Sequence, residues 1–524
     1  MRKQTKLVAV LSAAALFAIG ASMTSFAAGW AQEDGSWVYL DRDGDRVTEE
    51  WKKSGSNYYW LDEDGYMATN LLVEDDDDHY YVNENGVRVT NQWVNVDNID
   101  GDEVDGKTVD VLWYYMGSSG RAYKASENSE TGFRNTLIEG KRYLFDEEGR
   151  MVSGWTYVGN DTYYLGDENE GWAYTGWQIL EIDEDEMGTA NSAGVEYEDE
   201  AWFYFQSSGK AYKNKRKYIE GYYYSFDENG VMEDAWLLGT PSSYDGDTRS
   251  YYKEDSGYQK TGWVYTHEPN DEDSDNSWYY LVSSKKGAAF NLGGMDAKGA
   301  TNSNAQKYIN GNTPDGTLKE DVAAKVINGK TYLFDENGKM QTGVFKVAED
   351  DQIVRDGGNG NLGAGIYYFN KDGGSVNGQM ETGKVTLEYD GEDYVYYFAG
   401  TGKAYTNEMK DNSIYDGDGV RVEAGDGNNY EVVNVKDIAG GYVVIDNERF
   451  ENGAFVVSAS GKVKKSGTVT IDGVKYVIGG KQSGDGVEVD DYFVSWAYDK
   501  DADTDERVDL GNYDKWAAGV SVNN

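Results

Sequence analysis

The phrase TYLFDENGKMQTG, residues 331–343, has a near copy, RYLFDEEGRMVSG, at residues 142–154. Each phrase begins with aromatic and aliphatic residues, continues through acidic or amide residues, and reaches a glycine. Weaker forms such as WVYLDRDG, YYWLDEDG and HYYVNENG close at Gly44, Gly65 and Gly86, which are spaced 21 residues apart. Recurrence at a fixed period of this size predicts a repeat array rather than a set of unrelated domains.

The same phrase returns further along the chain with longer gaps between its copies. Its closing glycines there are Gly120, Gly149, Gly171, Gly209, Gly230, Gly257, Gly287, Gly338, Gly373 and Gly402. The longer gaps contain polar, acidic stretches such as VDNIDGDEVDGKTVD and HEPNDEDSDNS. Insertions at fixed places in a repeat map to loops, so we expect these stretches to interrupt the array without ending it.

Each unit is predicted to form a β-hairpin. Aromatic and β-branched residues favour strands, and the Asp, Asn and Gly that follow favour a tight turn. In WVYL, Trp37 and Tyr39 are expected on one face of the strand, and Val38 and Leu40 on the other. An isolated hairpin is barely stable in water, so the units must stack and bury a shared apolar stripe. The predicted fold class is all-β, a solenoid of stacked β-hairpins with repeats of about 20 residues and loop insertions.

Three regions are predicted along the chain. Basic residues before the apolar run 7–19, and small residues up to Ala28, predict a secretory signal peptide over residues 1–28. Residues 29–403 form the repeat array. Residues 404–524 are read as degenerate repeats with a C-terminal cap, or as a small β-domain. No other apolar stretch is long enough to span a bilayer.

Composition narrows the classes of function. The formal net charge of −46 disfavours binding to nucleic acid phosphates and favours the attraction of cations. The chain has no cysteine, so its stability must come from packing and not from disulfides. Aromatic residues make up 14% of the chain and prolines number only 3, which argues against a disordered polyelectrolyte.

The repeat units resemble the cell-wall-binding repeats of Gram-positive surface proteins. GWAQEDGSWVYLDRDG and TGWVYTHEPNDEDSDNSWYYL resemble choline-binding repeats, whereas GKTYLFDENGKMQTGVF and GIYYFNKDGG are similar to glucan-binding and clostridial-toxin-type repeats. The resemblance covers Gly29 to about Lys403 and, more faintly, residues 458–480. It implies a β-solenoid in which choline sits between consecutive hairpins, in a cage of two Trp from one repeat and one Tyr from the next.

Four repeats keep both tryptophans of that pattern. With the tyrosine of the following repeat, the implied ligand-binding sets are Trp30, Trp37 and Tyr59; Trp93, Trp113 and Tyr143; Trp177, Trp202 and Tyr224; and Trp263, Trp278 and Tyr332. A quaternary ammonium cannot donate a hydrogen bond and is attracted by the faces of aromatic rings. Many weak sites of this kind along one array act together through avidity. For each tryptophan the alternative is that the ring only packs within the hairpin stack.

Other repeats depart from the pattern. His79, Arg142, Thr331 and Ile366 stand where the opening Trp would be, and Val344 replaces the Trp of the GW pair. We expect these units to bind no choline, and to serve as spacers or to bind sugars.

The sequence therefore predicts a secreted, non-enzymatic protein of the cell wall or cell surface that binds wall polymers non-covalently. The favoured partner is choline on teichoic acid. The alternatives are a carbohydrate-binding protein, in which the same rings stack on glucan or glycan faces, and a structural surface array without a small ligand. No catalytic residue, metal site or cofactor is predicted, and only two histidines are present. The oligomeric state stays open at this level.

Overall fold

The computed structural model describes residues 28–126, 128–238, 249–269, 271–283, 288–290, 304–307, 320–371, 377–481, 488–499 and 508–509. The chain divides into two compact units, Met1–Lys213 with Phe226–Met232, and Asn214–Ser225 with Glu233–Asn524. The predicted signal peptide lies outside the described residues except for Ala28. Within the described residues, no helix has the length and apolar character needed to cross a membrane.

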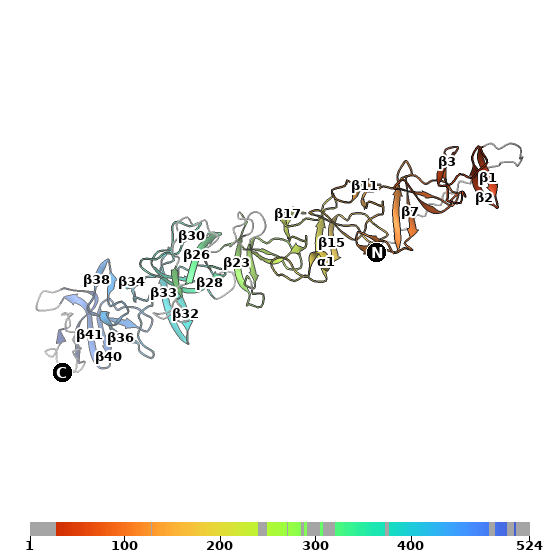
Figure 1. The fold of residues 1–524 in the computed structure, drawn as a ribbon. Coiled ribbons are helices and arrows are strands. Elements are labelled where there is room, and N and C mark those ends of the chain that lie inside the picture. The colour runs from red at the N-terminus through yellow and green to blue at the C-terminus, as the bar shows by residue number, and fades with distance from the viewer. Residues whose placement is uncertain are drawn as a thin grey trace. The chain divides into compact units, whose positions relative to one another are not determined.

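The first unit is a succession of antiparallel hairpins, as the repeat pattern predicts (Figure 1). The paired strands are β1 (Gly29–Glu33) with β2 (Ser36–Leu40), β3 (Glu50–Ser54) with β4 (Asn57–Leu61), β5 (Leu71–Asp75) with β6 (Asp78–Val82), β7 (Gln92–Asp97) with β10 (Val111–Met116), β11 (Arg134–Ile138) with β12 (Lys141–Phe145), β13 (Trp155–Val158) with β14 (Asp161–Tyr164), and β15 (Gly176–Glu181) with β16 (Glu200–Phe205).

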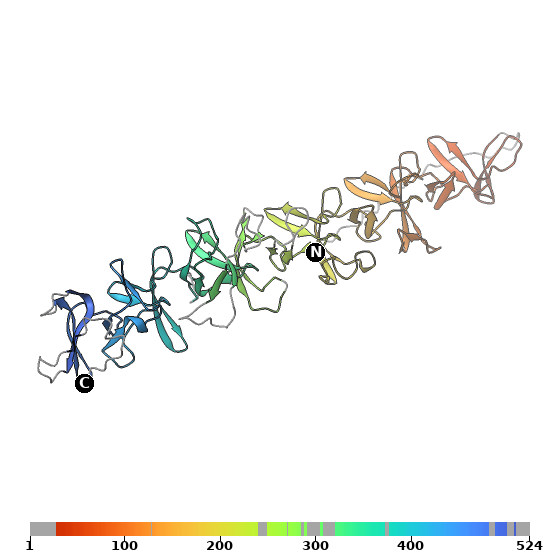
Figure 2. The same cartoon turned by 60° about the vertical axis from the view of Figure 1, so that its left-hand side comes forward.

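The insertions of this unit lie at hairpin tips. The small pair β8 (Glu103–Val104) and β9 (Lys107–Thr108) lies between β7 and β10, and the short helix α1 (Glu184–Met187) lies between β15 and β16. Figure 2 shows the hairpins of the first unit, coloured red to yellow, following one another in chain order. The insertions thus lengthen single loops and leave the strand pairs intact, which confirms their assignment to loops.

The turn predicted from the acidic phrase forms, but it is not the tip of the main hairpin. The tip between β1 and β2 is formed by Asp34 and Gly35, both with positive φ. Gly44 lies after β2, in a turn across which Leu40 makes a single bridge with Arg46. The strand that carries the GW tryptophan pairs along its full length with the next aromatic strand, whereas the segment after Gly44 offers only one bridging residue. The longer ladder defines the hairpin.

The acidic phrase has a specific structural role in that second turn. Asp62 Oδ1 accepts hydrogen bonds from the backbone N–H groups of Asp64 (3.1 Å) and Tyr66 (2.8 Å). Asn83 does the same for Asn85 and Val87 in the next repeat. An Asp or Asn side chain that caps its own turn in this way explains why these residues recur before the glycine.

The second residue after each turn glycine docks one hairpin on the preceding one, and we call it the junction residue. The N–H of Met67 donates to the Trp37 carbonyl at 2.7 Å, and the N–H of Met151 donates to the Trp113 carbonyl at 2.8 Å. Equivalent bonds join Arg88 to Tyr58, Ala122 to His79, Ala173 to Arg142, Ala211 to Thr162, Gln259 to Tyr223, Met380 to Thr331, Ala404 to Ile366, Arg421 to Val395, and Val463 to Asn412.

The core runs along these junctions as a shared stripe, as stacking requires. The last or next-to-last residue of the second strand is buried in most repeats: Leu61, Val82, Met116, Phe145, Phe205, Phe226, Tyr252, Leu281, Phe334, Phe369, Phe398 and Tyr415. Burial of one such side chain stabilises the fold by about 1.5–3 kcal/mol. Each hairpin therefore gains most of its stability from its neighbours in the chain.

The second unit contains wider sheets than the predicted two-stranded units. β17 (Lys215–Ile219) pairs with β18 (Tyr222–Phe226), and β19 (Met232–Glu233) follows. A five-stranded sheet has the order β20 (Ala235–Leu238), β21 (Arg249–Tyr252), β24 (Ala288–Ala289), β23 (Ser277–Val282) and β22 (Gly262–Thr266). A seven-stranded sheet has the order β28 (Met340–Gln341), β27 (Lys330–Asp335), β26 (Glu320–Ile327), β25 (Asn304–Lys307), β29 (Gly343–Val347) and β31 (Gly365–Phe369), with β30 (Arg355–Asp356) paired to β26.

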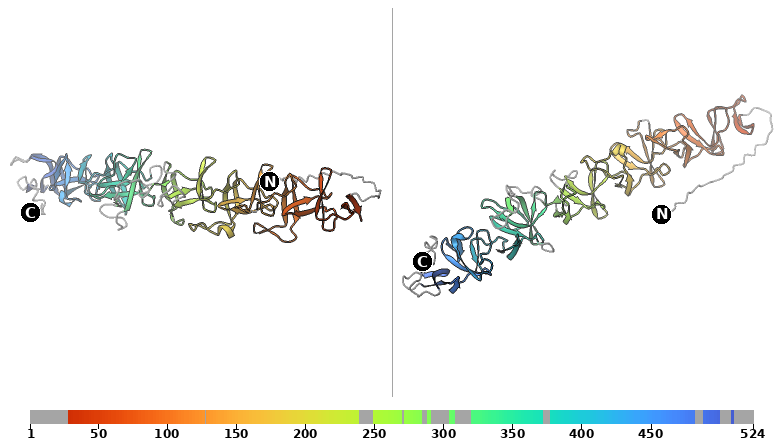
Figure 3. Two further views of the ribbon diagram at one scale, coloured as in Figure 1. Left: turned by 45° about the horizontal axis from the view of Figure 1, so that its top comes forward. Right: turned by 90° about the horizontal axis from the view of Figure 1, so that it is seen from below.

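The remaining strands follow the same mixed pattern (Figure 3). They are the hairpin β32 (Gly383–Tyr389) and β33 (Glu392–Phe398); the sheet β35 (Ser413–Tyr415), β34 (Glu408–Lys410), β37 (Val443–Ile445) and β38 (Glu448–Phe450); and the sheet β36 (Tyr430–Asn434), β39 (Ala454–Ser458), β42 (Glu488–Asp499), β41 (Val474–Lys481) and β40 (Gly467–Ile471), with β43 (Val508–Asp509) on β42. A 3-10 turn, η3 (Val435–Asp437), follows β36. Segments between hairpins supply extra strands here, and these cover edges that a two-stranded unit leaves unpaired.

Candidate aromatic cages between hairpins

The hairpin register places the two tryptophans of each predicted set on one face. In β22–β23, Trp263 lies opposite Tyr280, and Trp278 lies opposite Tyr265, two positions further along the ladder. The other three hairpins repeat this register. The ring centroids are 6.4 Å apart in Trp93–Trp113, 6.1 Å in Trp177–Trp202 and 6.2 Å in Trp263–Trp278, and Trp37 holds the equivalent position opposite Gln32 beside Trp30.

Three of the four predicted sets gain their tyrosine from the next hairpin. The ring-centroid distances are 5.3 Å for Trp30–Tyr59, 4.8 Å for Trp93–Tyr143 and 4.8 Å for Trp263–Tyr332. In the remaining set Trp177 and Trp202 belong to the first unit and Tyr224 belongs to the second unit. Trp177 lies 5.9 Å from Phe226 of its own unit.

The two tryptophans of a set have different surroundings. Trp263 is half-buried and its ring also contacts Tyr280 (5.2 Å) and Phe334 (5.9 Å). Trp278 is 37% exposed and Trp202 is 39% exposed. In these two hairpins the first tryptophan is the less exposed ring and the second tryptophan is the more exposed one.

A methionine lies at the junction position in these three sets, and the resemblance to choline-binding repeats did not single it out. Met151 is buried in one cluster with Tyr143, against which Trp93 and Trp113 pack. Met340 is buried with Tyr332 and packs against Trp263, and Met67 docks on Trp37. A thioether makes favourable contacts with ring edges and adapts to irregular space. The signal was present in the phrases DEDGYM, EEGRM and ENGKM, where Met always stands two residues after the glycine.

Tyr143 and Tyr332 are neutral at physiological pH. Burial raises the pKa of Tyr143 and of Tyr332 above the usual value of 10. Both residues therefore present uncharged aromatic faces to the cages.

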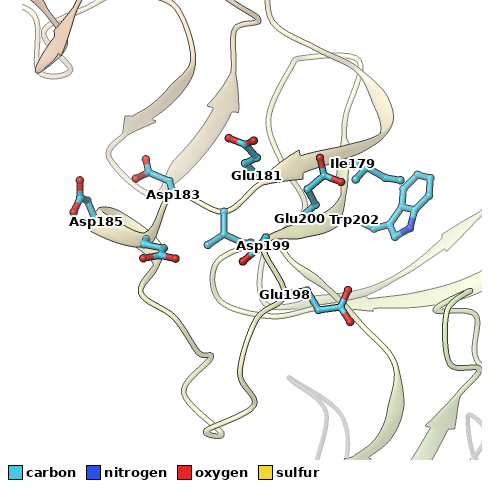
Figure 4. Close-up of a pocket in the computed structure, with 10 residues that line it drawn as sticks. Ile179, Glu181, Asp183, Asp185, Glu198, Asp199, Glu200 and Trp202 are labelled. Carbon is cyan, nitrogen blue, oxygen red and sulfur yellow. The ribbon is translucent and has the colours of Figure 1, made fainter.

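An acidic cavity borders the exposed tryptophan of the β15–β16 hairpin. The cavity has a volume of about 1090 Å³, and Ile179 and Trp202 form one end of it (Figure 4). Its other walls are acidic: Glu181, Asp183, Glu184, Asp185, Glu198, Asp199 and Glu200, with Ile182. A wall of this charge raises the local concentration of cations beside Trp202.

Three other tryptophans, at the strand position of Trp30, donate their indole N–H groups to segments further along the chain. Trp51 Nε1 donates to Asp75 Oδ2, Trp155 Nε1 to the Glu181 carbonyl, and Trp236 Nε1 to the His267 carbonyl, each at 3.0 Å. Each acceptor belongs to a segment 24 to 31 residues further along the chain. At the position of the second tryptophan these hairpins have Tyr58, Thr162 and Arg249.

The positions that depart from the pattern have varied surroundings, and Arg142 borders a cavity of about 450 Å³. Val344 and Ile366 are buried in one aliphatic and aromatic cluster with Tyr396. Thr331 is buried, and the His79 ring lies 5.7 Å from that of Tyr114. Arg142 donates to Asn135 on the paired strand. None of these five positions adds an outer tryptophan to a cage.

Comparison with known proteins assigns the repeats. Residues 46–87 match the model of the choline-binding repeat, and residues 325–340 match the model of a cell wall binding repeat. The chain is 25% identical to glucosyltransferase-I of Streptococcus downei over 329 residues, which are 53% of this chain and 20% of that protein. It is 25% identical to glucosyltransferase-S of Streptococcus mutans over 296 residues, which are 53% of this chain and 18% of that protein. The chain therefore spans about a fifth of the length of these curated relatives.

Among solved structures, CbpJ of Streptococcus pneumoniae aligns with 76% of this chain and 100% of its own, at 17% identity and a TM-score of 0.29. Choline binding protein F of Streptococcus pneumoniae aligns with 77% of this chain and 100% of its own, at 18% identity and a TM-score of 0.27. The family assignment rests on the repeat matches and the hairpin architecture. The chain contains repeats of the Gram-positive cell-wall-binding family, matched at residues 46–87 and 325–340.

Proposed function

We propose that the protein binds choline-bearing polymers of the cell wall non-covalently, through aromatic cages at its hairpin junctions. The carrying observation is the repeated set of two tryptophans, one tyrosine from the next hairpin and one methionine beneath them, as in Trp93, Trp113, Tyr143 and Met151. A quaternary ammonium fits such a set, because its attraction to each ring contributes about 0.5–2 kcal/mol and it needs no hydrogen-bond acceptor.

The charge of the protein supports a cationic ligand. The net charge of −46 and the acidic wall beside Trp202 favour a cation over an anion near the cages. Individual cages of this type bind weakly, and several on one chain would together retain the protein on a polyvalent polymer. In this proposal the protein acts by binding and not by catalysis, and it works outside the cell at the wall surface.

The test is a titration of the protein with choline chloride, followed by tryptophan fluorescence and by calorimetry. We expect a saturable change in the millimolar range and release of the protein from choline-bearing cell walls over the same range. Unchanged fluorescence and no heat at saturating choline would contradict the proposal.

A second candidate function, sugar binding, is favoured by the exposed tyrosines of β17 and β18. Tyr218, Tyr222 and Tyr223 are 62%, 52% and 41% exposed, and the rings of Tyr218 and Tyr223 lie 4.9 Å apart. Flat, exposed rings of this kind can stack on sugar faces. If glucan binds here, Tyr218→Ala should weaken glucan retention and leave choline binding unchanged.

We also propose that residues 404–524 continue the array as degenerate repeats and close it. The hydrogen bond of the junction residue recurs there at Ala404, Arg421 and Val463. The alternative, a separate small β-domain, predicts that residues 404–524 fold when expressed without the preceding repeats.

A further inference from the structure

One junction holds a cation that belongs to the chain itself. The guanidinium carbon of Arg88 lies 4.1 Å from the centroid of the Tyr58 ring, 5.2 Å from that of Trp51 and 5.6 Å from that of Tyr80. Three aromatic rings from two consecutive hairpins, β3–β4 and β5–β6, therefore surround one positive charge.

These rings occupy the positions of a cage. Tyr58 lies opposite Lys53 in β3–β4, as Trp37 lies opposite Gln32 in β1–β2. Trp51 and Tyr80 follow Trp30 and Tyr59 by one 21-residue period. The fourth position differs between the two repeats: Arg88 stands at the junction position that Met67 holds in the preceding repeat.

Arg88 differs from other junction arginines because no acid accompanies it. Arg46 pairs with Glu33 and Arg421 pairs with Glu423, both at 2.6 Å. Among the described residues, no ion pair and no side-chain hydrogen bond involves Arg88, and its Nε is buried. In a chain with 94 acidic residues and 48 lysines and arginines, an arginine held only by rings indicates that the rings are its binding site.

The next hairpin holds this side chain in place. A Cβ atom built on Gly120 would lie 2.7 Å from Arg88 Nε. The turn at Gly120 therefore packs directly against the Arg88 side chain. The neighbouring Lys53 Nζ also faces Tyr58, at 5.3 Å from its centroid. The Trp51 indole N–H is occupied by Asp75.

We propose that Trp51, Tyr58 and Tyr80 form a quaternary-ammonium cage that Arg88 occupies as an intramolecular ligand, so that this junction does not bind external choline. A tethered ligand competes at an effective concentration of about millimolar or more, which matches or exceeds a weak free ligand. The inference rests on the proposed function and deepens it. The choline-binding repeat match, residues 46–87, contains all three rings and stops one residue before Arg88, so the repeat match alone would assign an open site here.

The test is Arg88→Met, which installs the side chain found at the junctions of the complete sets. Calorimetry with choline chloride should give one more site per chain than the wild type, and Arg88→Met with Tyr80→Ala should lose that site again. The matched control is Arg46→Met, which removes an arginine from the same repeat position but from an ion pair with Glu33, and which should leave the number of sites unchanged.

Two outcomes separate this inference from the proposed function. Wild-type binding with no additional site in a folded Arg88→Met variant would overturn the occupied cage. Binding by Arg88→Met alone, with a silent wild type, would support the occupied cage and contradict choline binding at the native sets. In the wild-type protein, NMR should show the Arg88 Hε and Hδ resonances shifted upfield by ring currents, and resonances at random-coil positions would also overturn the inference.

Discussion

At the residue scale, the turn glycines are required by neighbouring repeats as well as by their own backbone. Gly171 has a φ of +63°, and a Cβ there would lie 2.1 Å from Sδ of Met151, the junction residue of the preceding repeat. Gly106 has a similar φ of +72°, but no atom lies within 4 Å of its Cβ position. The two sites therefore separate the cost of backbone conformation from the cost of the junction.

The first prediction compares Gly171→Ala with Gly106→Ala. The left-handed conformation alone should cost about 1–2 kcal/mol in both variants. Gly171→Ala should cost about 1–3 kcal/mol more, because Met151 must move out of the way. Hydrogen exchange of peptides spanning residues 134–174, with thermal unfolding, measures the difference. Equal destabilisation of the two variants would show that Met151 moves aside without a cost in free energy of unfolding, and it would contradict the prediction.

Displacement of Met151 should also disturb the cage above it. Since Met151 shares a cluster with Tyr143, Trp93 and Trp113, Gly171→Ala should weaken choline binding at this set, whereas Gly106→Ala should leave it unchanged.

At the scale of the element, the two tryptophans of one hairpin differ in their exposure and in the rings that they contact. Trp263 contacts Tyr332 of the next hairpin at 4.8 Å and Phe334 at 5.9 Å. Trp278 contacts Trp263 and Tyr265 of its own hairpin and keeps 37% of its surface exposed. Within the described part of the chain, ring contacts to the next hairpin are made by Trp263 and not by Trp278.

The second prediction follows for alanine variants of this pair. Trp278→Ala should remove one choline site and lower the free energy of unfolding by less than about 1 kcal/mol, because an exposed ring contributes little packing. Trp263→Ala should cost about 3–5 kcal/mol locally, because it leaves a cavity between hairpins. Choline calorimetry and hydrogen exchange over β22–β27 distinguish the two effects. A large loss of stability in Trp278→Ala would show that both tryptophans stabilise the fold by packing, and it would contradict the prediction.

At the scale of the whole molecule, negative charge sets the dependence of stability on pH. Burial raises the pKa of Asp335 and of Asp416 from 3.8 to about 6. Both carboxylates cap glycine turns, and Asp335 Oδ1 accepts hydrogen bonds from the N–H groups of Asn337 and Lys339. The folded chain therefore holds protons there that the unfolded chain releases.

The third prediction concerns stability between pH 4 and pH 7.5. A raised carboxyl pKa contributes stability that is fully present below about pH 3.8 and is lost as the pH rises through about 6. Wild-type thermal unfolding should therefore occur at a higher temperature at pH 5 than at pH 7.5. Asp335→Asn should stabilise the protein at pH 7.5 by up to about 3 kcal/mol and flatten the profile, since Asn83 caps the same turn in its own repeat.

The control for this profile is Glu336→Gln, which removes the same charge from an exposed neighbour. It should keep the wild-type slope. If Asp335→Asn keeps the wild-type dependence of unfolding temperature on pH, then groups other than Asp335 cause that dependence.

The sequence alone determined the hairpin repeat, its turn chemistry and the residue types of the cages. Those features depend on local rules: a 21-residue period, alternation along a strand, and the need for Asp or Asn before a glycine with positive φ. Three predicted sets meet across their junctions as expected, because stacking at a fixed period brings equivalent positions of consecutive hairpins together.

Tertiary structure decided the rest. The position of the hairpin tip, the wider sheets of the second unit and the role of the junction residue depend on which strands pair and which turn covers which side chain. The clearest case is Arg88: in the sequence it is one basic residue among 48 lysines and arginines, and only the docking of three hairpins places its charge among Trp51, Tyr58 and Tyr80. Arg88 lies 37 residues from Trp51 and 30 from Tyr58, and these contacts depend on how the hairpins pack and not on the residue types of the repeat alone.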